Sequence, residues 1–381
     1  MGSSGVGRVA SGQRSTSAPY PSPGTVWPVR LGDLQTPALV ADRQGFDANV
    51  ATMAARWPGA ALRPHVKAFK STALAAELVA AGHHAFCAAT VREVLGMAAA
   101  GLGADLLLAN EVPDPARLAP LGELVRTGAA RVTVAVDGPE TIAAAAAAGL
   151  REVFVDVNVG MPRCGCAPDR AGALATAAQQ AGLTVRGTMG YEGHVVGIVD
   201  RDERAAGAGT AMRLLADAHA AVQAAGGGAI CTGGGTGTWD CNDTVTELQA
   251  GSYVLMDTAY DALGLPFVPA VAVVGTVVSR DVGGGYAVAD VGLKALAMDH
   301  GNPTIDGAAV WFCSDEHVTF SMRDGRPLPP VGGRVAVWPA HLDPTIAKHE
   351  RIHVVDRIGR DVPVDLDADV LTTWPVDLRH W

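Results

Sequence analysis

The residues best suited to chemistry follow short apolar segments of the sequence. The segment ALRPHV at 61–66 contains His65 and is followed by Lys67. If this segment is a strand, residues two apart face the same side, so the imidazole and the amine share one surface. A lysine at an inward-facing strand end is either a surface residue that keeps its amine in solvent or a functional amine with a lowered pKa. The spacing alone leaves both interpretations open.

A glycine-rich segment, GGGTGT at 233–238, also follows an apolar run. Consecutive glycines allow backbone N–H groups to surround an anion, and threonine hydroxyls add donors. Gly234, Gly235 and Thr236 are therefore candidate phosphate ligands, the alternative being a flexible loop without a ligand. The segment has neither the Gly-Lys-Ser/Thr end of a P-loop nor the spacing of a dinucleotide-binding motif, so a monophosphate group fits better. A phosphate site opposite a strand-end lysine favours pyridoxal phosphate as cofactor.

Other polar residues follow two more apolar runs. Arg163 comes after the segment at 152–159, and Tyr191 and His194 come at the end of the segment at 185–191 and just beyond it. Each is consistent with an ordinary loop residue. If the runs are parallel strands of one barrel, however, all three residues lie at the rim that carries Lys67 and the glycine-rich segment.

A possible metal site lies near the C-terminus, in the segment WPAHLDPT. His341 and Asp343 are two residues apart, so in an extended segment an imidazole nitrogen and a carboxylate face one point, which suits a divalent cation. A hydrogen bond between the two side chains in a turn is the alternative. Two ligands alone leave the rest of the coordination shell to water or substrate.

The pattern of apolar runs predicts the elements that position these residues. Runs spaced mostly 21 to 32 residues apart alternate with alanine-rich segments of helical periodicity. Strands that alternate with helices pair in parallel, and eight of them predict a (β/α)8 TIM-type barrel. The eight expected strands follow an opening strand at 36–42 and cover 61–66, 84–89, 105–110, 131–137, 152–159, 185–191, 229–234 and 252–257.

The rhythm changes near Pro269, after which strands follow one another without helical segments between them. Turns such as DVGGG and DGRP separate them, which is typical of an antiparallel β domain. We therefore expect a flexible leader at 1–23, a barrel at 37–267 that binds the cofactor, and a β domain formed by 24–36 and 268–381 that carries the metal site.

Composition limits the classes of partner. The 381 residues are 49% hydrophobic and 18% charged, which excludes intrinsic disorder for the body of the chain. A net charge of −10 argues against nucleic acid and anionic membranes as partners. The sequence contains no C-x-x-C pair, no secretory signal and no apolar run long enough to span a bilayer, so we expect a cytoplasmic protein.

The segments in their order resemble the D-threonine aldolase and eukaryotic-type D-serine dehydratase family, whose members are pyridoxal phosphate enzymes with an alanine racemase-like fold. The resemblance covers about residues 36–345. The segments that carry it are TPALVAD, LRPHVKAFKS, VNVGMPRCG, MGYEGH, GGGTGT, TELQAGSYVLMD, VADVGLKAL and WPAHLDPT. Several distinct motifs in one order are far more specific than any one of them.

The resemblance implies a role for each candidate residue. Lys67 would form the Schiff base with His65 beside it, and Arg163 and Tyr191 would lie near the cofactor. The glycine-rich segment and Tyr253 would bind the phosphate. His341 and Asp343 would hold a divalent metal, with Mn²⁺ or Mg²⁺ favoured by the carboxylate and Zn²⁺ or Co²⁺ as alternatives. His194 would be the catalytic base. The family also implies a homodimer whose subunits share the active sites.

The implied activity is retro-aldol cleavage of a D-β-hydroxy-α-amino acid to glycine and an aldehyde. The His-x-Asp pair and MGYEGH are more similar to the aldolases, since the dehydratases tend to have His-x-Cys. Alternatives are a D-serine-type dehydratase, an aldolase for an α-substituted or bulkier substrate, and a carrier of pyridoxal phosphate without catalytic activity. Phe69 replaces a histidine that is usual in the family, and we expect its ring to lie beside the cofactor.

Overall fold

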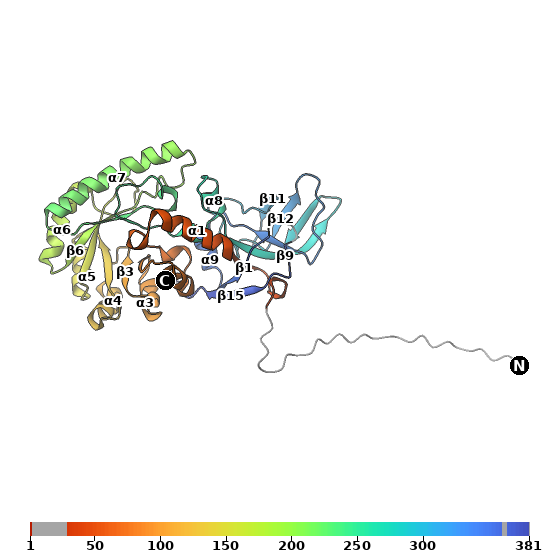
Figure 1. Cartoon of the computed structure of the whole chain (residues 1–381), viewed down its shortest axis with the longest axis horizontal. Helices are drawn as coiled ribbons and strands as arrows, with labels where there is room; N and C mark the ends of the chain where they lie inside the picture. Colours follow the sequence, from red (N-terminus) through yellow and green to blue (C-terminus); the bar gives the residue numbers. More distant parts are fainter. Residues whose placement is uncertain (2–28, 360–363, 381) are drawn as a thin grey trace.

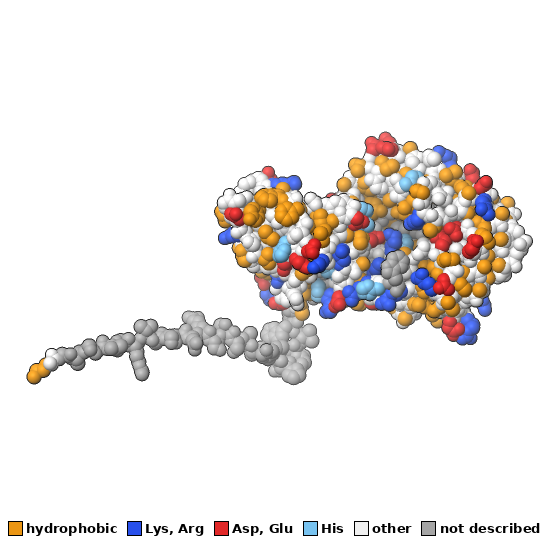
Figure 2. Space-filling model, turned by 180° about the vertical axis from the view of Figure 1, so that it is seen from behind, with side chains coloured by type: hydrophobic (Ala, Val, Ile, Leu, Met, Phe, Trp, Pro, Cys, Tyr) orange, Lys and Arg blue, Asp and Glu red, His pale blue; other side chains and the backbone are white. Residues whose placement is uncertain are grey.

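A computed structural model describes Met1 and residues 29–359 and 364–380. The described residues form two lobes, a barrel surrounded by helices and a smaller lobe built on a second sheet (Figure 1). Apart from Met1, the expected leader at 1–23 lies outside the described residues. Figure 2 shows charged and histidine side chains gathered where the two lobes meet.

The larger lobe has the expected alternation of strands and helices. In the described part of the chain, seven strands pair in parallel in sequence order. Helices connect them, and several begin with a side-chain cap, such as Ser71, Thr90 and Asp200, whose oxygens accept a hydrogen bond from the first turn. The strands are β2 (Ala85–Ala88), β3 (Asp105–Leu108), β4 (Val132–Val136), β5 (Glu152–Asp156), β6 (Thr184–Gly190), β7 (Ile230–Gly233) and β8 (Glu247–Leu248). The helices are α1 (Arg43–Arg56), α2 (Thr72–Ala80), α3 (Val91–Ala99), α4 (Pro115–Thr127), α5 (Pro139–Ala147), α6 (Ala171–Gln180), α7 (Arg201–Ala224) and α8 (Thr258–Asp261).

The barrel closes through residues 62–65, which we call the seam. Leu62 forms a parallel bridge with Leu248 of β8, and His65 forms one with Cys87 of β2. The strand expected at 61–66 is therefore reduced to two isolated bridges. Pro64 lies between the bridges and has no N–H to donate, which fits the short pairing.

The prediction of a strand at 252–257 is wrong. Ser252–Val254 forms a 3₁₀ helix, and the eighth barrel position is β8, which lies upstream. The run SYVLMD looks like a strand because it is apolar and rich in β-formers. In the structure Tyr253, Val254, Leu255 and Met256 are instead fully buried in the core that joins the lobes.

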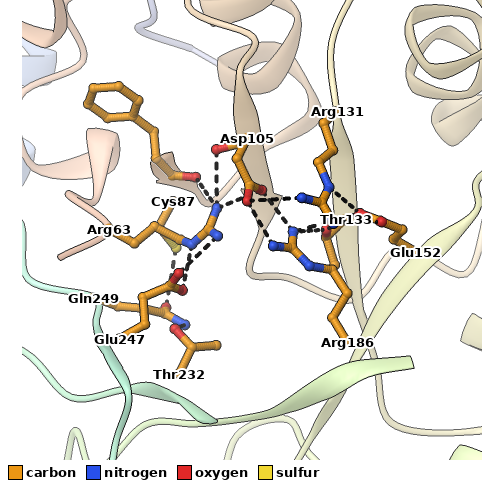
Figure 3. Close-up of polar contacts among 11 residues, drawn as sticks. Arg63, Cys87, Asp105, Arg131, Thr133, Glu152, Arg186, Thr232, Glu247 and Gln249 are labelled. Atoms are coloured by element: carbon orange, nitrogen blue, oxygen red, sulfur yellow. Dashed lines mark hydrogen bonds and ion pairs between the residues drawn. The ribbon is translucent and has the colours of Figure 1, made fainter. Parts of the chain in front are cut away.

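A layer of ion pairs fills the barrel interior near the first residues of its strands, and we call it the ionic layer (Figure 3). The Arg63 guanidinium is fully buried and donates to both oxygens of Glu247, at 2.6 and 3.0 Å, and to Asp105 at 3.1 Å. Arg186 donates to both oxygens of Asp105 at 2.8 Å. The outer pair is Arg131 with Glu152. Each charged group in the interior has an oppositely charged partner, so the layer fills this end of the barrel without leaving a buried charge unpaired.

The smaller lobe contains a mixed sheet that is mostly antiparallel. Among the described residues its strand order is β11-β12-β10-β9-β1-β14-β15, with β13 also paired to β9. The strands are β1 (Ala38–Asp42), β9 (Val271–Asp281), β10 (Tyr286–Ala289), β11 (Ala308–Cys313), β12 (Val318–Met322), β13 (Arg334–Val337), β14 (Arg351–Val355) and β15 (Val370–Pro375), and α9 (Leu342–Ala347) follows β13. β1 pairs antiparallel with β9 and parallel with β14, so it lies in this sheet although its residues fall within the 37–267 unit.

Direct contacts hold the two lobes together. The Asn49 side chain of α1 accepts from the Val268 N–H and donates to the Val268 carbonyl, both at 2.8 Å. The Leu378 N–H donates to the Lys70 carbonyl at 3.0 Å. These contacts attach the smaller lobe to the barrel. No helix in the described part of the chain is long and apolar enough to cross a membrane.

Candidate active site

A cavity of about 320 Å³ lies at the carboxyl ends of the barrel strands. This is the end at which barrels of this type carry their active sites. Its lining brings together most of the residues expected from the sequence, namely His65, Lys67, Arg163, Tyr191, Gly234, Gly235 and Thr236. The other lining residues are Ala89, Ala109, Asn110, Glu111, Asp156, Cys164, Met189, Gln249, Gly251, Ser252 and Tyr260.

Lys67 contacts the smaller lobe. It lies in a short 3₁₀ helix, Val66–Ala68, directly after the seam, and its Nζ is 2.6 Å from Oδ2 of Asp343. Ser252 donates to the other oxygen of Asp343 at 3.1 Å. Burial lowers the pKa of Lys67, but the Asp343 charge outweighs it and leaves that pKa above its ordinary value. The structure therefore pairs the candidate cofactor-binding amine with a candidate metal ligand.

His65 is positioned by the start of the same helix. Its Nδ1 accepts from the Lys67 N–H at 3.4 Å, and its ring is buried. Burial, together with the nearby Lys67 charge, lowers the pKa of His65 well below its ordinary value. The ring is therefore neutral at neutral pH, which suits a packing surface beside a cofactor better than a cation.

The glycine-rich segment depends on the absence of side chains. Gly234 has φ +76°, which favours glycine, and a Cβ at Gly233 or Gly237 would lie 2.0 Å from a backbone carbonyl oxygen. Thr236 Oγ1 accepts from the Tyr253 N–H at 3.1 Å. Close packing against neighbouring backbone therefore requires the glycines, and Gly234, Gly235 and Thr236 line the cavity.

Glu192 fixes the far side of this loop. It is fully buried, and its Oε1 accepts from Thr238 Oγ1 at 2.7 Å and from Asn242 Nδ2 at 3.1 Å. Burial raises the pKa of Glu192. The sequence motif MGYEGH thus supplies an anchor for the glycine-rich segment as well as the cavity residue Tyr191.

Tyr253 does not line the cavity. Its side chain is fully buried against Phe267, with ring centroids 5.8 Å apart, and its hydroxyl has no hydrogen-bond partner among the described residues. Only its backbone N–H reaches the loop, through Thr236. Phe69 is fully buried in the core and is also absent from the lining, so the expectation that its ring adjoins the cofactor is not supported.

Another part of the cavity lining is polar. The Arg163 guanidinium lies 5.4 Å from the centre of the Tyr191 ring, a cation–π contact. Asp156 and Glu111 also face this cavity, and burial together with the Glu111 charge raises the pKa of Asp156 well above its ordinary value. The two carboxyl groups therefore add acidic character to the wall that carries Arg163.

His194 lies outside the cavity lining. Its side chain is exposed, and its ring is close to Gly160, where a Cβ in place of the glycine hydrogen would be 2.9 Å from the imidazole. It is three residues beyond Tyr191, which does line the cavity. The structure therefore places His194 in the loop at the rim and does not bring it to Lys67.

The candidate metal ligands separate into two groups. Asp343 faces Lys67, whereas His341 Nδ1 is 2.6 Å from Asp299 Oδ2. The His300 ring stacks on His341, with centroids 3.8 Å apart. Burial raises the pKa of Asp343, but Lys67 outweighs that effect, and His341 still lies close enough to lower the pKa further.

Sequence reasoning missed several residues of this region. Ser252 was missed because a strand was expected at 252–257 in place of the 3₁₀ helix that brings its hydroxyl to Asp343. Glu111 was missed because it follows β3 in a segment with no known motif. Asp299 and His300 form part of the sequence MDHG, in which an acid, a histidine and a turn-forming glycine are adjacent. That composition was the available signal for a polar turn.

Comparisons with known proteins identify the family of the chain. Residues 41–258 match the family model described as "Alanine racemase, N-terminal domain", and residues 270–355 match "Putative serine dehydratase domain". A D-threonine aldolase of Arthrobacter sp. is 35% identical over 87% of this chain and 92% of its own. The chain belongs to the D-threonine aldolase and D-serine dehydratase family.

Other members of this family are also similar along most of their length. A 3-hydroxy-D-aspartate aldolase of Paracoccus denitrificans is 32% identical over 91% of this chain and 92% of its own. The solved D-threonine aldolase of Filomicrobium marinum superposes with a TM-score of 0.85 at 33% identity, covering 93% of this chain and 98% of that one. Alanine racemases at 13–19% identity share the fold.

Proposed function

We propose that the protein cleaves D-β-hydroxy-α-amino acids to glycine and an aldehyde, with pyridoxal phosphate and a divalent metal. The observation that carries this proposal is the 2.6 Å contact between Lys67 Nζ and Asp343 Oδ2, which brings the candidate cofactor amine and a candidate metal ligand to one point. The names of the relatives support it, since two of them are a D-threonine aldolase and a 3-hydroxy-D-aspartate aldolase.

The cavity residues fit pyridoxal phosphate. Lys67 offers the amine, the glycine-rich segment lines the cavity through Gly234, Gly235 and Thr236, and Tyr191 and Arg163 form an aromatic and cationic wall. When bound, the cofactor supplies an electron-accepting ring that stabilises negative charge on Cα. The raised pKa of Lys67 means that its amine must lose a proton before it reacts with a carbonyl group.

The donor set of the metal site consists of the His341 imidazole and the Asp343 carboxylate. An imidazole nitrogen with a hard carboxylate oxygen favours Mn²⁺ or Mg²⁺, with Zn²⁺ or Co²⁺ as alternatives. When bound, the metal supplies Lewis acidity that lowers the pKa of the substrate β-hydroxyl. Ser252 keeps the carboxylate oriented through its 3.1 Å hydrogen bond.

The remaining step assigned to the chain is proton removal from the β-hydroxyl. His194 is the proposed base, because its loop begins at the cavity residue Tyr191 and its ring is exposed at the rim. His65, two residues before Lys67, is buried, and its pKa is lowered well below its ordinary value. We therefore assign it to packing beside the cofactor and not to proton transfer. Lys67 is the group that can return a proton to Cα.

A dehydratase is the second candidate. A D-threo-3-hydroxyaspartate dehydratase of Delftia sp. is 30% identical over 70% of this chain and 74% of its own. Elimination would release a keto acid and ammonia, with the metal activating the hydroxyl as a leaving group. The His-x-Asp pair favours the aldolase, because the dehydratases of the family tend to have cysteine at the second position.

A product assay tests the proposal. The purified protein is loaded with pyridoxal phosphate and Mn²⁺ and offered D-threonine, D-phenylserine or D-serine, with and without a chelator. We expect glycine and an aldehyde that require the metal, and no product from the Lys67→Ala variant. Keto acid and ammonia would assign the dehydratase reaction instead. Retained cofactor absorbance without any turnover would support a carrier role.

A further inference from the structure

The proposed metal ligand His341 has a hydrogen-bond partner outside the sequence motif. Its Nδ1 lies 2.6 Å from Oδ2 of Asp299. A carboxylate accepts hydrogen bonds and has none to donate, so Nδ1 carries the hydrogen and donates it. The lone pair of the neutral ring is then on Nε2, which is the nitrogen left to bind a cation. Asp299 therefore selects the tautomer that a metal ligand needs.

His300 restricts the rotation of the same imidazole. The two rings are stacked, with centroids 3.8 Å apart and an angle of 6° between their planes. The hydrogen bond from Nδ1 and the stacked ring together define both the tautomer and the plane of His341. This arrangement is that of a metal ligand whose second nitrogen is held by an outer partner.

A three-ligand site is the competing interpretation, because Asp299, His300 and His341 offer ligand atoms within 4.8 Å of one another. The 2.6 Å contact argues against it. Two ligand atoms on one small divalent cation lie about 3 Å apart, given metal–ligand bonds of about 2.1 Å. A protonated Nδ1 also has no lone pair for the cation. The contact is a hydrogen bond between a ligand and its partner.

Asp299 and His300 occupy the centre of a β-turn. The Gly301 N–H donates to the Met298 carbonyl at 3.2 Å, and Gly301 has φ +111°. The turn presents both side chains on adjacent positions, so one segment supplies the hydrogen-bond acceptor and the stacked ring.

The turn is also attached to the segment that carries His341. Thr345, in the first turns of α9, is fully buried and accepts from the Ala297 N–H at 3.0 Å. Its hydroxyl donates to the His341 carbonyl at 2.7 Å. Asp257 holds the next residue by accepting from the Leu342 N–H at 2.9 Å. The turn and the ligand segment thus form one unit.

We propose that Asp299 is a positioning residue that orients His341 for the divalent metal, and that His300 supports the ring by stacking and does not bind the metal. The inference rests on the proposed function, since it assumes that His341 is a metal ligand. It goes further by assigning roles to two residues of the 298–301 turn.

Metal titration of the cofactor-loaded protein tests the assignment. The electron paramagnetic resonance signal of free Mn²⁺ gives the dissociation constant for the wild type, Asp299→Ala, Asp299→Asn and His300→Phe. Asp315→Ala is the matched control, because Asp315 is an exposed aspartate of the same lobe. Cofactor absorbance and thermal unfolding of each variant verify that the fold is intact.

Loss of an outer partner of this kind weakens metal binding about 10- to 100-fold. We expect that loss for Asp299→Ala, partial recovery in Asp299→Asn, which keeps an acceptor oxygen, and wild-type affinity within about twofold for His300→Phe and Asp315→Ala. Unchanged affinity in Asp299→Ala would overturn the proposal. Loss of binding in His300→Phe would make His300 a ligand and would also overturn it.

The His341→Ala variant separates this inference from the proposed function. If the wild type and His341→Ala bind Mn²⁺ equally, the metal site itself is misassigned. If His341→Ala loses the metal while Asp299→Ala keeps it, only the positioning role fails.

Discussion

Asp343 joins the two parts of the proposed site, because its carboxylate contacts the Lys67 amine and the Ser252 hydroxyl at the same time. Burial opposes ionisation of Asp343, but the charge of Lys67 outweighs it and lowers the pKa, so the group is ionised at neutral pH. An ionised carboxylate is the form that binds a hard divalent cation. Its role can therefore be tested separately from that of the amine.

Asp343→Ala should abolish metal-dependent turnover and leave cofactor binding intact. Lewis acid activation of a hydroxyl contributes several kcal/mol, so we expect a loss of roughly a hundredfold or more. Initial rates with and without a chelator, together with the absorbance of the bound cofactor, measure both effects. Turnover of the wild type that survives in chelator would contradict the metal role.

His194→Ala should lower turnover about 10²- to 10⁴-fold, the range for loss of a general base, while the cofactor stays bound. Rates over a series of pH values are the appropriate measurement, because loss of a base changes the profile and loss of packing does not. His317→Ala, at an exposed position on the other lobe, is the control. Wild-type rates in His194→Ala would exclude it as the base.

For residues that lie in motifs, the sequence predicted which side chains meet at one end of the barrel. Lys67, Arg163 and the glycine-rich segment meet at one cavity because they follow barrel strands, and strand order fixes that rim. Tyr253 was assigned to the phosphate by resemblance, yet only its backbone reaches the loop. Asp299 was missed because its partner His341 is 42 residues away, and local spacing carries no information about such a contact.

Among the barrel strands, the ionic layer is the feature whose contribution to stability can be tested most directly. Glu247→Ala would leave the fully buried Arg63 guanidinium without its bidentate partner. Removal of one member of a buried pair costs about 3 to 5 kcal/mol. Urea unfolding should show that loss, whereas Glu123→Ala, which breaks an exposed pair with Arg126, should change the stability very little. Equal effects of the two variants would contradict the importance of the layer.

Asp105 makes the ionic layer sensitive to acid. Burial opposes ionisation of this residue, but Arg186 and Arg63 outweigh it and hold its pKa below the ordinary value of 3.8. A group with a lowered pKa in the folded state stabilises the fold above its unfolded pKa and ceases to do so as pH falls toward the folded pKa. The difference in unfolding free energy between wild type and Asp105→Asn should therefore be constant from pH 7 to about 5 and shrink at lower pH. A constant difference at pH 3 would contradict this.

Most barrel strands could be predicted because they are short apolar or β-branched runs at a regular spacing along the sequence. The exceptions have physical reasons. Pro64 limits pairing in the seam, and residues 252–257 satisfy their apolar character by burial in a 3₁₀ segment between the lobes. β15 had no distinct signal, since its residues are largely exposed and it is held by pairing with β14.

At the scale of the whole molecule, the smaller lobe has exposed large apolar side chains, among them Trp311 and Phe312 of β11. The family resemblance predicts a homodimer, and the mass in solution tests that prediction. Sedimentation equilibrium should give twice the chain mass of 38.9 kDa, independent of cofactor. A monomer at micromolar concentration would contradict the expectation.

Local opening of the barrel at the seam can be measured by amide hydrogen exchange. Its backbone hydrogen bonds include those from the Arg63 N–H to the Leu248 carbonyl at 2.9 Å and from the His65 N–H to the Ala250 carbonyl at 3.0 Å, and the buried Arg63 side chain adds its ion pairs to Glu247 and Asp105. Local opening of a protein exchanges its amide hydrogens with solvent in cooperative units, and the weakest units exchange first. Because Lys67 directly follows the seam, the exchange rate of these two amides reports how often the candidate cofactor amine leaves its place.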